Sequence, residues 1–411
     1  LPLPLAHGSD LEPRPACEHA ILAAETSPRE SLMSVLAETI LESGERVGAQ
    51  IADPIEWAAG RVDVLDAIEP AVRGRDPGPW AGLVGETVAT PGGPLPAVTG
   101  LETVGRCAWR AFAERRLGVA AMPDPRLGLP ETRGLLLGSV VHRVLETIVQ
   151  DLVGCGEESL VELAAVDGHE VPWPSEKRLN ELVADAALGV AARNGLAATG
   201  VAPLLAAQAR PYLEVARAMD WSDGTAHGVV AAEVEGAVEV EGAGTVRFRA
   251  DRLDRDGDAL ILIDYKSGKP QSTAKGEAKR REHLLAEVAM GRTLQAVAYA
   301  RGLPESSPGV GRYLSLKPHM GEASDEVRRT SAGRDDAEMT TAFDHAIATI
   351  VSGWRVGALT PRVSEAKKPN ETPAACGFCP VEQACLRSDS GYLRNIVDWV
   401  SGPAGNGARI E

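Results

Sequence analysis

A nearly all-apolar strand, Ala259–Tyr265, runs directly into Lys266 and constrains the fold of this chain more than any other feature. Short runs rich in Ile and Leu are typical of strands buried on both faces. Before it, Val229–Val240 alternates apolar and acidic residues, as a half-buried strand does. Thr245–Leu253 also has strand character, and Asp256-Gly-Asp258 predicts a tight turn after it. The sequence therefore predicts three consecutive strands.

Helical periodicity dominates the rest of the chain, with apolar residues three or four positions apart. It predicts helices over residues 101–117, 135–153, 277–300 and 335–356, and two more within 175–219. A fourth strand is expected over Gly311–Lys317. This order of elements predicts an α/β fold, in which helices flank a mixed central sheet and further helices are inserted.

A Gly- and Pro-rich stretch over residues 73–98 predicts a linker and a domain boundary near residue 95. Residues 1–95 are then a helical N-terminal region, residues 96–395 the main domain, and residues 396–411 a C-terminal tail. The sequence contains no G-x-x-x-x-G-K-[ST] motif, so the chain by itself is not expected to be an ATP-driven motor.

Asp264 and Lys266 lie two positions apart at the end of the third strand, so alternation sends both side chains to one face. A two-residue turn between the second and third strands, counted outward, brings Asp251 opposite Asp264 on that face. A slip of one residue would break this arrangement. With the predicted register, two carboxylates and one amine lie within reach of one point.

Such a set suits phosphodiester hydrolysis. Carboxylates bind a divalent cation such as Mg²⁺, which prefers oxygen ligands and retains several waters. The cation polarises a phosphate and lowers the pKa of a bound water, while a lysine orients that water or stabilises the developing charge. In isolation, Asp264 and Lys266 would fit a surface ion pair about equally well, because this spacing is common.

Two helical motifs accompany the carboxylates and the lysine. His142 and Glu146 are four residues apart on the predicted helix 135–153 and share a face, so His142 could be a further metal ligand. Gln295 and Tyr299 have the same spacing on the predicted helix 277–300. Taken singly, each motif is more simply interpreted as a core histidine or an ordinary polar helix face.

Together these motifs resemble the nuclease domain of the RecB and AddB helicase–nuclease family within the PD-(D/E)XK superfamily. Four segments occur in the family's order: Gly138–Glu146, Arg249–Asp254, Ile263–Gly268 and Gln295–Tyr299. The family usually has glycine where this chain has Arg249 or Ala250, a departure that concerns strand packing more than chemistry. The resemblance implies a restriction-endonuclease-like core.

The resemblance also implies roles for single residues. His142, Asp251 and Asp264 would bind Mg²⁺ or Mn²⁺, and Lys266 would be catalytic. Gln295 and Tyr299 would lie beside the site and help to position DNA. Supporting roles are implied for two further residues, Glu146 and Asp254.

The C-terminal part of the chain carries a C-x2-C-x5-C cluster, formed by Cys376, Cys379 and Cys385. Closely spaced thiolates are typical of a bound metal, and either zinc or an iron–sulfur cluster would need a fourth ligand. Spacing alone does not separate the two. The candidates for the fourth ligand are the remaining cysteines: Cys17, Cys107 and Cys155.

The segment around Cys107, Gly105–Gly118, resembles the one that precedes the motif helix in AddB-type nucleases. This resemblance implies that Cys107 and the three C-terminal cysteines hold a [4Fe–4S] cluster. Such a link would close a long loop and restrict the unfolded chain, so a structural role is expected, with redox sensing as the alternative. Cys17 and Cys155 are expected to be plain buried thiols.

Net charge, hydropathy and cysteine spacing indicate which partners and which compartment to expect. The net charge of −16 argues against an extended nucleic-acid surface, although a groove can be locally basic. No apolar run approaches the roughly 20 residues that span a bilayer, so no membrane partner is expected. The cysteine spacing indicates metal binding in a reducing, cytoplasmic compartment.

The function expected from the resemblance is a Mg²⁺-dependent DNA nuclease that acts in double-strand-break repair. It would be an exonuclease on single strands or DNA ends, with a helicase or helicase–nuclease as partner. Residues 1–95 would be the end of a helicase-like region or an independent helical domain. Two alternatives remain: a catalytically silent DNA-binding scaffold subunit, and a stand-alone exonuclease resembling CRISPR-adaptation nucleases.

Overall fold

A computed structural model of the chain describes residue 82 and residues 97–119, 134–154, 158–196, 198–320, 325–362, 373–382 and 385–388. By its contacts the chain divides into Val84–Ser388 and a second unit that joins Leu1–Leu83 to Asp389–Glu411. Every described helix and strand belongs to the first unit. Apart from residue 82, the predicted regions 1–95 and 396–411 lie outside the described residues, as do Cys17 and Cys155.

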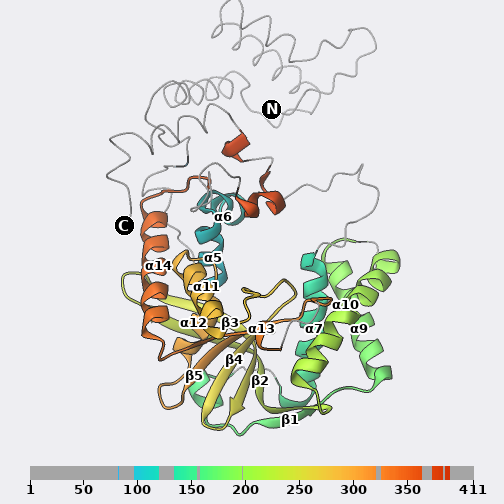
Figure 1. Ribbon diagram of the computed structural model, residues 1–411. Coiled ribbons are helices and arrows are strands. Elements are labelled where there is room, and N and C mark those ends of the chain that lie inside the picture. The colour runs from blue at the N-terminus through green and yellow to red at the C-terminus, as the bar shows by residue number, and fades with distance from the viewer. Residues whose placement is uncertain are drawn as a thin grey trace, which may run out of the picture. The chain divides into compact units, whose positions relative to one another are not determined.

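A six-stranded sheet forms the centre of this unit, with its strands in chain order (Figure 1). The strands are β1 (His169–Pro172), β2 (Thr225–Val240), β3 (Gly244–Asp256), β4 (Ala259–Lys266), β5 (Gly309–Ser315) and β6 (Arg329–Gly333). The β4–β5 pair is parallel and the other neighbouring pairs are antiparallel. The mixed sheet confirms the α/β fold expected from the sequence.

The β3–β4 hairpin has the register that the sequence predicts. Asp256 is the partner of Ala259, and the pairing continues outward to Arg252 and Ile263. The turn needs a left-handed residue, which Gly257 supplies with φ of +57°. The next position beyond the recorded pairs brings Asp251 level with Asp264.

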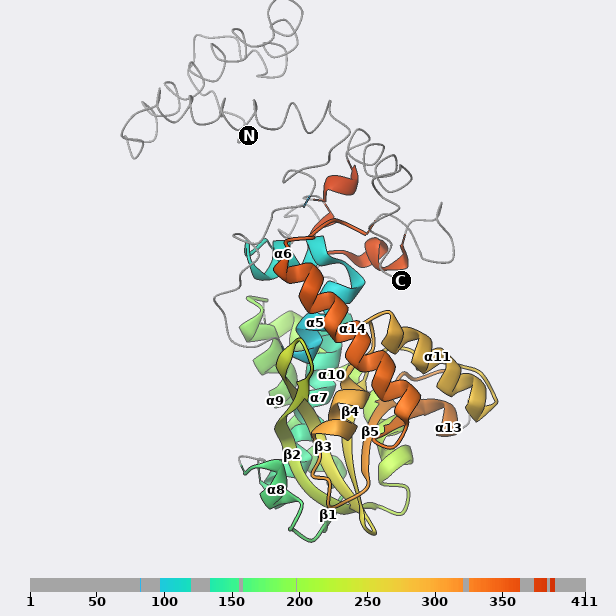
Figure 2. The same cartoon turned by 90° about the vertical axis from the view of Figure 1, so that its left-hand side faces the viewer.

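Helices cover both faces of the sheet (Figure 1 and Figure 2). On one face lie α7 (Gly134–Val153), α9 (Glu176–Arg193) and α10 (Ala198–Asp220). On the other lie α5 (Val98–Arg106), α11 (Glu277–Ala289), α12 (Gln295–Gly302) and α14 (Ala337–Arg355). Shorter helices are α6 (Ala108–Arg115), α8 (Leu160–Leu163), α13 (Asp325–Arg328) and the 3-10 turns η2 (Ala374–Phe378) and η4 (Leu386–Ser388). Among the described helices, none is both long and apolar enough to cross a bilayer.

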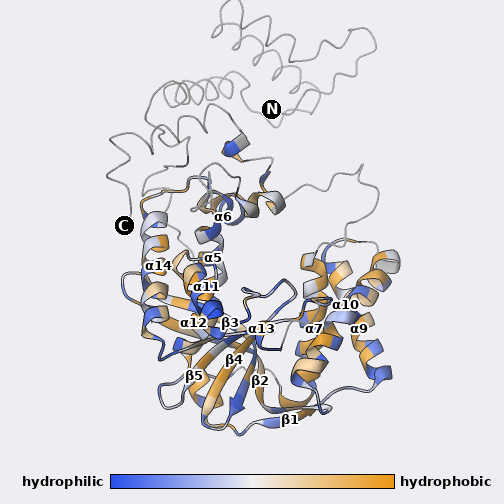
Figure 3. Ribbon diagram, viewed as in Figure 1, coloured by the Kyte–Doolittle hydropathy of each residue, from blue (hydrophilic) through white to orange (hydrophobic). Residues whose placement is uncertain are grey.

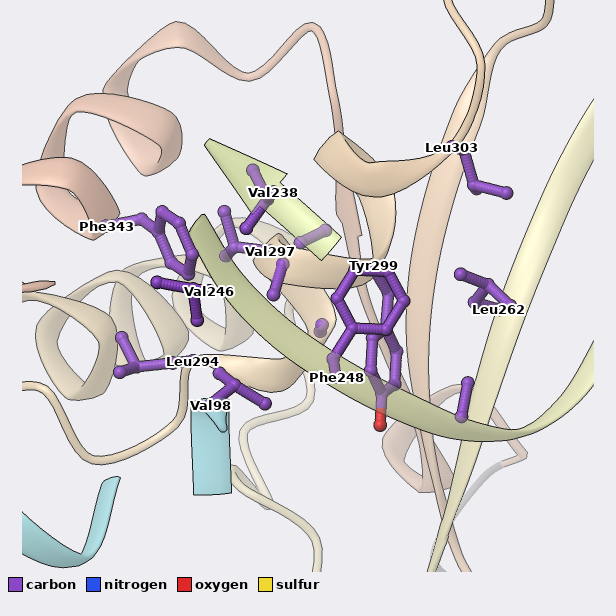
Figure 4. Packing of buried hydrophobic residues seen from close by; sticks show 14 of the residues in the cluster. Val98, Val238, Val246, Phe248, Leu262, Leu294, Val297, Tyr299, Leu303 and Phe343 are labelled. Carbon is purple, nitrogen blue, oxygen red and sulfur yellow. The ribbon is translucent and has the colours of Figure 1, made fainter. Parts of the chain in front are cut away.

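Each face of the sheet has its own hydrophobic core. In one core Phe248 of β3 packs on Tyr299 of α12, with ring centroids 5.1 Å apart (Figure 4). The other core joins Ile261, Ile263 and Tyr265 of β4 to the apolar sides of α7, α9 and α10. Figure 3 shows hydrophobic residues along these three helices. Because β4 is buried on both faces, its apolar run needs no alternation.

Two predicted helices are broken in the structure, and both breaks position functional candidates. The predicted helix 101–117 divides into α5 and α6 at Cys107, whose backbone is extended with φ of −167°. The predicted helix 277–300 divides into α11 and α12, with Gly291 at φ of +69° in the turn between them. Two short edge strands, β1 and β6, were not predicted, because neither has a clear apolar alternation.

Candidate active site

Asp264 and Lys266 form the centre of the candidate site, at the end of β4. Asp264 is buried, with its side chain 8% exposed, whereas the side chain of Lys266 is 34% exposed. The Lys266 Nζ atom lies 2.5 Å from Asp264 Oδ2. It also lies 5.2 Å from the centroid of the Tyr313 ring on the neighbouring strand β5. The amine is therefore held against a buried carboxylate while part of it remains accessible.

Asp251 joins this pair through the hairpin and through α7. Its Oδ2 accepts a hydrogen bond from the backbone N–H of Tyr265 at 2.6 Å, and its Oδ1 lies 3.0 Å from His142 Nδ1. One turn before His142, Gly138 lets α7 come close to the end of β4, since an added Cβ would lie 3.0 Å from Ser267 Oγ. The structure thus brings together three predicted metal ligands from different elements.

Gln295 and Tyr299 of α12 form hydrogen bonds to the carboxylate–lysine pair. Gln295 Oε1 accepts a hydrogen bond from Lys266 Nζ at 2.8 Å, and Gln295 Nε2 donates to Asp264 Oδ1 at 3.0 Å. The Tyr299 hydroxyl donates to the carbonyl of Arg249 at 2.8 Å. Gln295 is 5% exposed and Tyr299 is fully buried. Both side chains therefore contact Asp264, Gln295 Nε2 at 3.0 Å and the Tyr299 hydroxyl at 3.3 Å, and they lie beside the carboxylate–lysine pair.

The two residues with expected supporting roles lie in different surroundings. Asp254 accepts two hydrogen bonds from the buried guanidinium of Arg252, at 2.8 and 2.6 Å. Arg252 also donates to the hydroxyl of Tyr265 at 2.7 Å, so Asp254 supports the strand that carries Asp264. Glu146 accepts hydrogen bonds from Arg143 at 2.6 Å and from Gln150 at 3.0 Å, one turn after His142 on α7.

Glu233 is a member of the site that its sequence position did not reveal. The alternation of Val229–Val240 placed it among solvent-facing carboxylates, but its side chain is only 14% exposed and pairs with Arg249. Its backbone has φ of +54°, which is unusual for a residue other than glycine. Burial and the nearby charge of Asp251 raise the pKa of Glu233 to about 7. The alternation of β2 is interrupted here, since Ala232 lies in one hydrophobic core and Val234 in the other.

Burial and charge oppose each other across the site. In Asp264 burial prevails over the attraction of Lys266 and raises the pKa of the carboxyl group. In Asp251 burial is outweighed by the charge and hydrogen bond of His142, which lower its pKa. Burial favours the neutral imidazole of His142, but the charge of Asp251 raises the pKa of His142 to about 9. Perturbed groups of this kind concentrate at functional sites.

Comparison with known proteins identifies the family. A model of the PD-(D/E)XK nuclease superfamily matches residues 97–386, most of the chain. The chain belongs to this superfamily. No curated protein matches it. The solved structure of SSO0001 is similar over 62% of this chain and 95% of that one, at 14% identity and a TM-score of 0.23.

Membership of the PD-(D/E)XK superfamily indicates a nuclease, and the donor atoms can be compared with the needs of a divalent cation. Asp264 Oδ2 is buried, and the Lys266 amine beside it supplies its counter-charge. Its oxygen chemistry fits a hard cation. Nevertheless, no three His, Cys, Asp or Glu side chains in the described ranges are arranged to hold a metal ion. In this structure His142 is paired with Asp251 instead.

The cysteines form a second cluster, away from the PD-(D/E)XK motif. Cys107, Cys376, Cys379 and Cys385 are all free thiols and partly exposed. Burial raises the pKa of Cys379 and of Cys385, and the nearby Cys107 adds to both shifts. The fold therefore brings Cys107 close to the C-terminal cysteines, although they too lack a metal-holding geometry in the part of the chain described.

Proposed function

We propose that this protein is a Mg²⁺-dependent deoxyribonuclease. The observation that carries the proposal is the contact of Lys266 with Asp264 at 2.5 Å, at a strand end where the hairpin register delivers Asp251. Superfamily membership supports phosphodiester hydrolysis as the reaction class. Intact Asp251, Asp264 and Lys266 favour an enzyme over a silent scaffold subunit, which would have no need to retain all three.

The proposed chemistry assigns each group a distinct task. Asp251 and Asp264 offer carboxylate oxygens to Mg²⁺ or Mn²⁺, and the cation would activate water and polarise the scissile phosphate. Lys266 keeps a positive charge beside the reacting phosphate and stabilises charge that develops on its oxygens. Gln295 and Tyr299 fix the orientation of Asp264 and Lys266 and need not touch the substrate, which is consistent with their burial.

His142 is proposed as the third ligand, and its protonation predicts how metal binding depends on pH. With a pKa of about 9, the imidazole is protonated at neutral pH and must lose a proton to bind a cation. Mn²⁺ affinity should therefore rise about tenfold per pH unit between pH 6.5 and 8.5, and level off above pH 9. Calorimetric titration of the DNA-free protein with Mn²⁺ at several pH values measures this slope.

His142→Ala is the control for that titration. The variant should bind Mn²⁺ more weakly, and the slope of affinity against pH should flatten. An unchanged slope in the variant, or a wild-type affinity that does not vary between pH 6.5 and 8.5, would remove His142 from the ligand set.

The cysteine cluster is proposed to hold a [4Fe–4S] cluster through Cys107, Cys376, Cys379 and Cys385. Four thiols without a histidine would also suit zinc. The resemblance of the segment around Cys107 to AddB-type nucleases favours an iron–sulfur cluster instead. Its proposed role is structural, as a link between the start and the end of the nuclease domain. Repair of double-strand breaks, a helicase partner and a cytoplasmic location are proposed on the same resemblance.

The substrate is proposed to be single-stranded DNA or a DNA end. In Mg²⁺ the wild-type protein should degrade linear single-stranded DNA to short products, spare circular single strands of the same sequence, and stop when EDTA is added. Gel analysis of products from both DNAs makes the comparison. Equal cleavage of circles would overturn the exonuclease assignment, and no cleavage of either DNA would overturn the nuclease assignment.

A further inference from the structure

Helix α5 is fastened to the turn between α11 and α12 by contacts at backbone level. A Cβ on Gly105 would lie 2.3 Å from the carbonyl oxygen of Gly291, so the two backbones touch. Arg106 Nη2 donates a hydrogen bond to the carbonyl oxygen of Arg292 at 2.8 Å. The turn that precedes α12 is therefore set by a helix from a distant part of the sequence.

Glu102 of α5 binds the N-terminus of α12. Its Oε1 accepts hydrogen bonds from the backbone N–H groups of Leu294 at 2.7 Å and Gln295 at 3.2 Å. The carboxyl group is buried, with Glu102 only 5% exposed. The first N–H groups of a helix lack partners within the helix, and Leu294 gives no side-chain cap. Glu102 thus supplies from outside the cap that α12 lacks.

The capped helix end carries the side chain that holds the catalytic pair. The backbone N–H of Gln295 donates to Glu102, while the Gln295 side chain contacts Lys266 at 2.8 Å and Asp264 at 3.0 Å. The next N–H, that of Ala296, donates to the Tyr313 hydroxyl at 3.0 Å. The backbone of Gln295 is therefore held by Glu102, and its side chain is held by Lys266 and Asp264. A shift of this end of α12 would displace the Gln295 side chain and with it the amine of Lys266.

We infer that Glu102 is a positioning residue for Lys266, acting through the N-terminus of α12 and the side chain of Gln295. The inference rests on the proposed nuclease function of the site. Glu102 itself is not placed in contact with substrate or cation. A purely structural role would instead make Glu102 matter for stability alone, with no specific effect on turnover.

Three variants separate these roles. Glu102→Ala removes the acceptor and should lower kcat roughly 10- to 100-fold, with KM within about threefold of wild type, since misplaced catalytic groups cost turnover. Glu102→Gln keeps an acceptor oxygen and should restore most of the rate. Thr103→Ala is the control on the same helix: it removes only a hydrogen bond to the carbonyl of Thr99 within α5, so its kcat should stay within about threefold of wild type.

A double substitution tests whether Glu102 acts through Gln295. If it does, adding Glu102→Ala to Gln295→Ala should lower kcat no more than about twofold further, because residues of one network are not additive. Multiplication of the two single effects would overturn the route through Gln295. A Glu102→Ala enzyme that turns over like wild type would overturn the positioning role altogether.

Amide hydrogen exchange on the full-length proteins keeps the inference separate from the nuclease assignment. The amides of Leu294 and Gln295 should be protected in wild type and in Glu102→Gln, and should exchange at least about tenfold faster in Glu102→Ala. If wild type proves inactive, the nuclease proposal fails, while faster exchange in Glu102→Ala would still support the anchor. Unchanged protection in Glu102→Ala would overturn it in either case.

Discussion

Replacing Lys266 with methionine is expected to lower the rate of DNA cleavage roughly 10²- to 10³-fold, the effect of removing one group that stabilises transition-state charge. Methionine keeps most of the apolar stem but cannot carry the charge that lies 2.5 Å from Asp264. DNA affinity should stay within about threefold, because one partly exposed lysine contributes little to overall binding of a polyanion. Single-turnover cleavage with protein in excess measures the chemical step directly.

Lys177→Met is the matched control for this variant. Lys177 is an exposed lysine on α9, an element that contributes no residue to the proposed catalytic cluster. Its substitution should leave the cleavage rate unchanged. Equal rates for Lys266→Met and wild type would remove the lysine from the mechanism, whereas equal losses in both variants would indicate a general effect of charge on DNA binding.

Replacing Cys379 with serine is expected to cost the protein its metal and much of its stability. A link between Cys107 and the C-terminal cysteines closes a long loop, and loss of such a link weakens folding by up to roughly 5 kcal/mol in a chain-entropy model. That corresponds to a fall of about 10 °C in the midpoint of thermal unfolding for a domain of this size. Anaerobic purification followed by visible absorbance, metal analysis and thermal unfolding measures both effects.

Cys155→Ser is the control, since Cys155 is expected to be an unligated thiol. It should keep the brown colour, the iron content and the unfolding midpoint of wild type. If the wild-type protein is colourless and contains zinc, the metal is zinc and not an iron–sulfur cluster, but the link between Cys107 and the C-terminal cysteines stands. Wild type without bound metal, or a Cys379→Ser variant as stable as wild type, would contradict the link itself.

The central hairpin could be predicted in detail from sequence because two independent local signals agree there. The apolar run of β4 establishes the strand, and the Gly257 turn establishes its register with β3. These two signals predict that Asp251 lies level with Asp264, and the prediction requires no contact between distant parts of the sequence. The Asp264–Lys266 contact follows from alternation along one strand.

The shell around the catalytic pair could not be predicted in the same way. Glu102 looks like any polar position of an amphipathic helix, and its role depends on a contact with Gln295 across a long stretch of sequence. The break between α11 and α12 depends on the same packing, because Gly291 adopts its turn against Gly105. Glu233 escaped notice for another reason: alternation assigns faces correctly only while the strand is regular.

Cleavage of linear single-stranded DNA by wild type and by Asp264→Asn, each in Mg²⁺ and in EDTA, tests the central claim most directly. Asparagine preserves the size of the side chain and its oxygen acceptor for Gln295, but removes the charge that would hold the cation. We expect cleavage by wild type in Mg²⁺ alone, and a loss of at least about 10³-fold in Asp264→Asn. Cleavage by the variant at the wild-type rate, or by wild type in EDTA, would contradict a cation-dependent site built on Asp264.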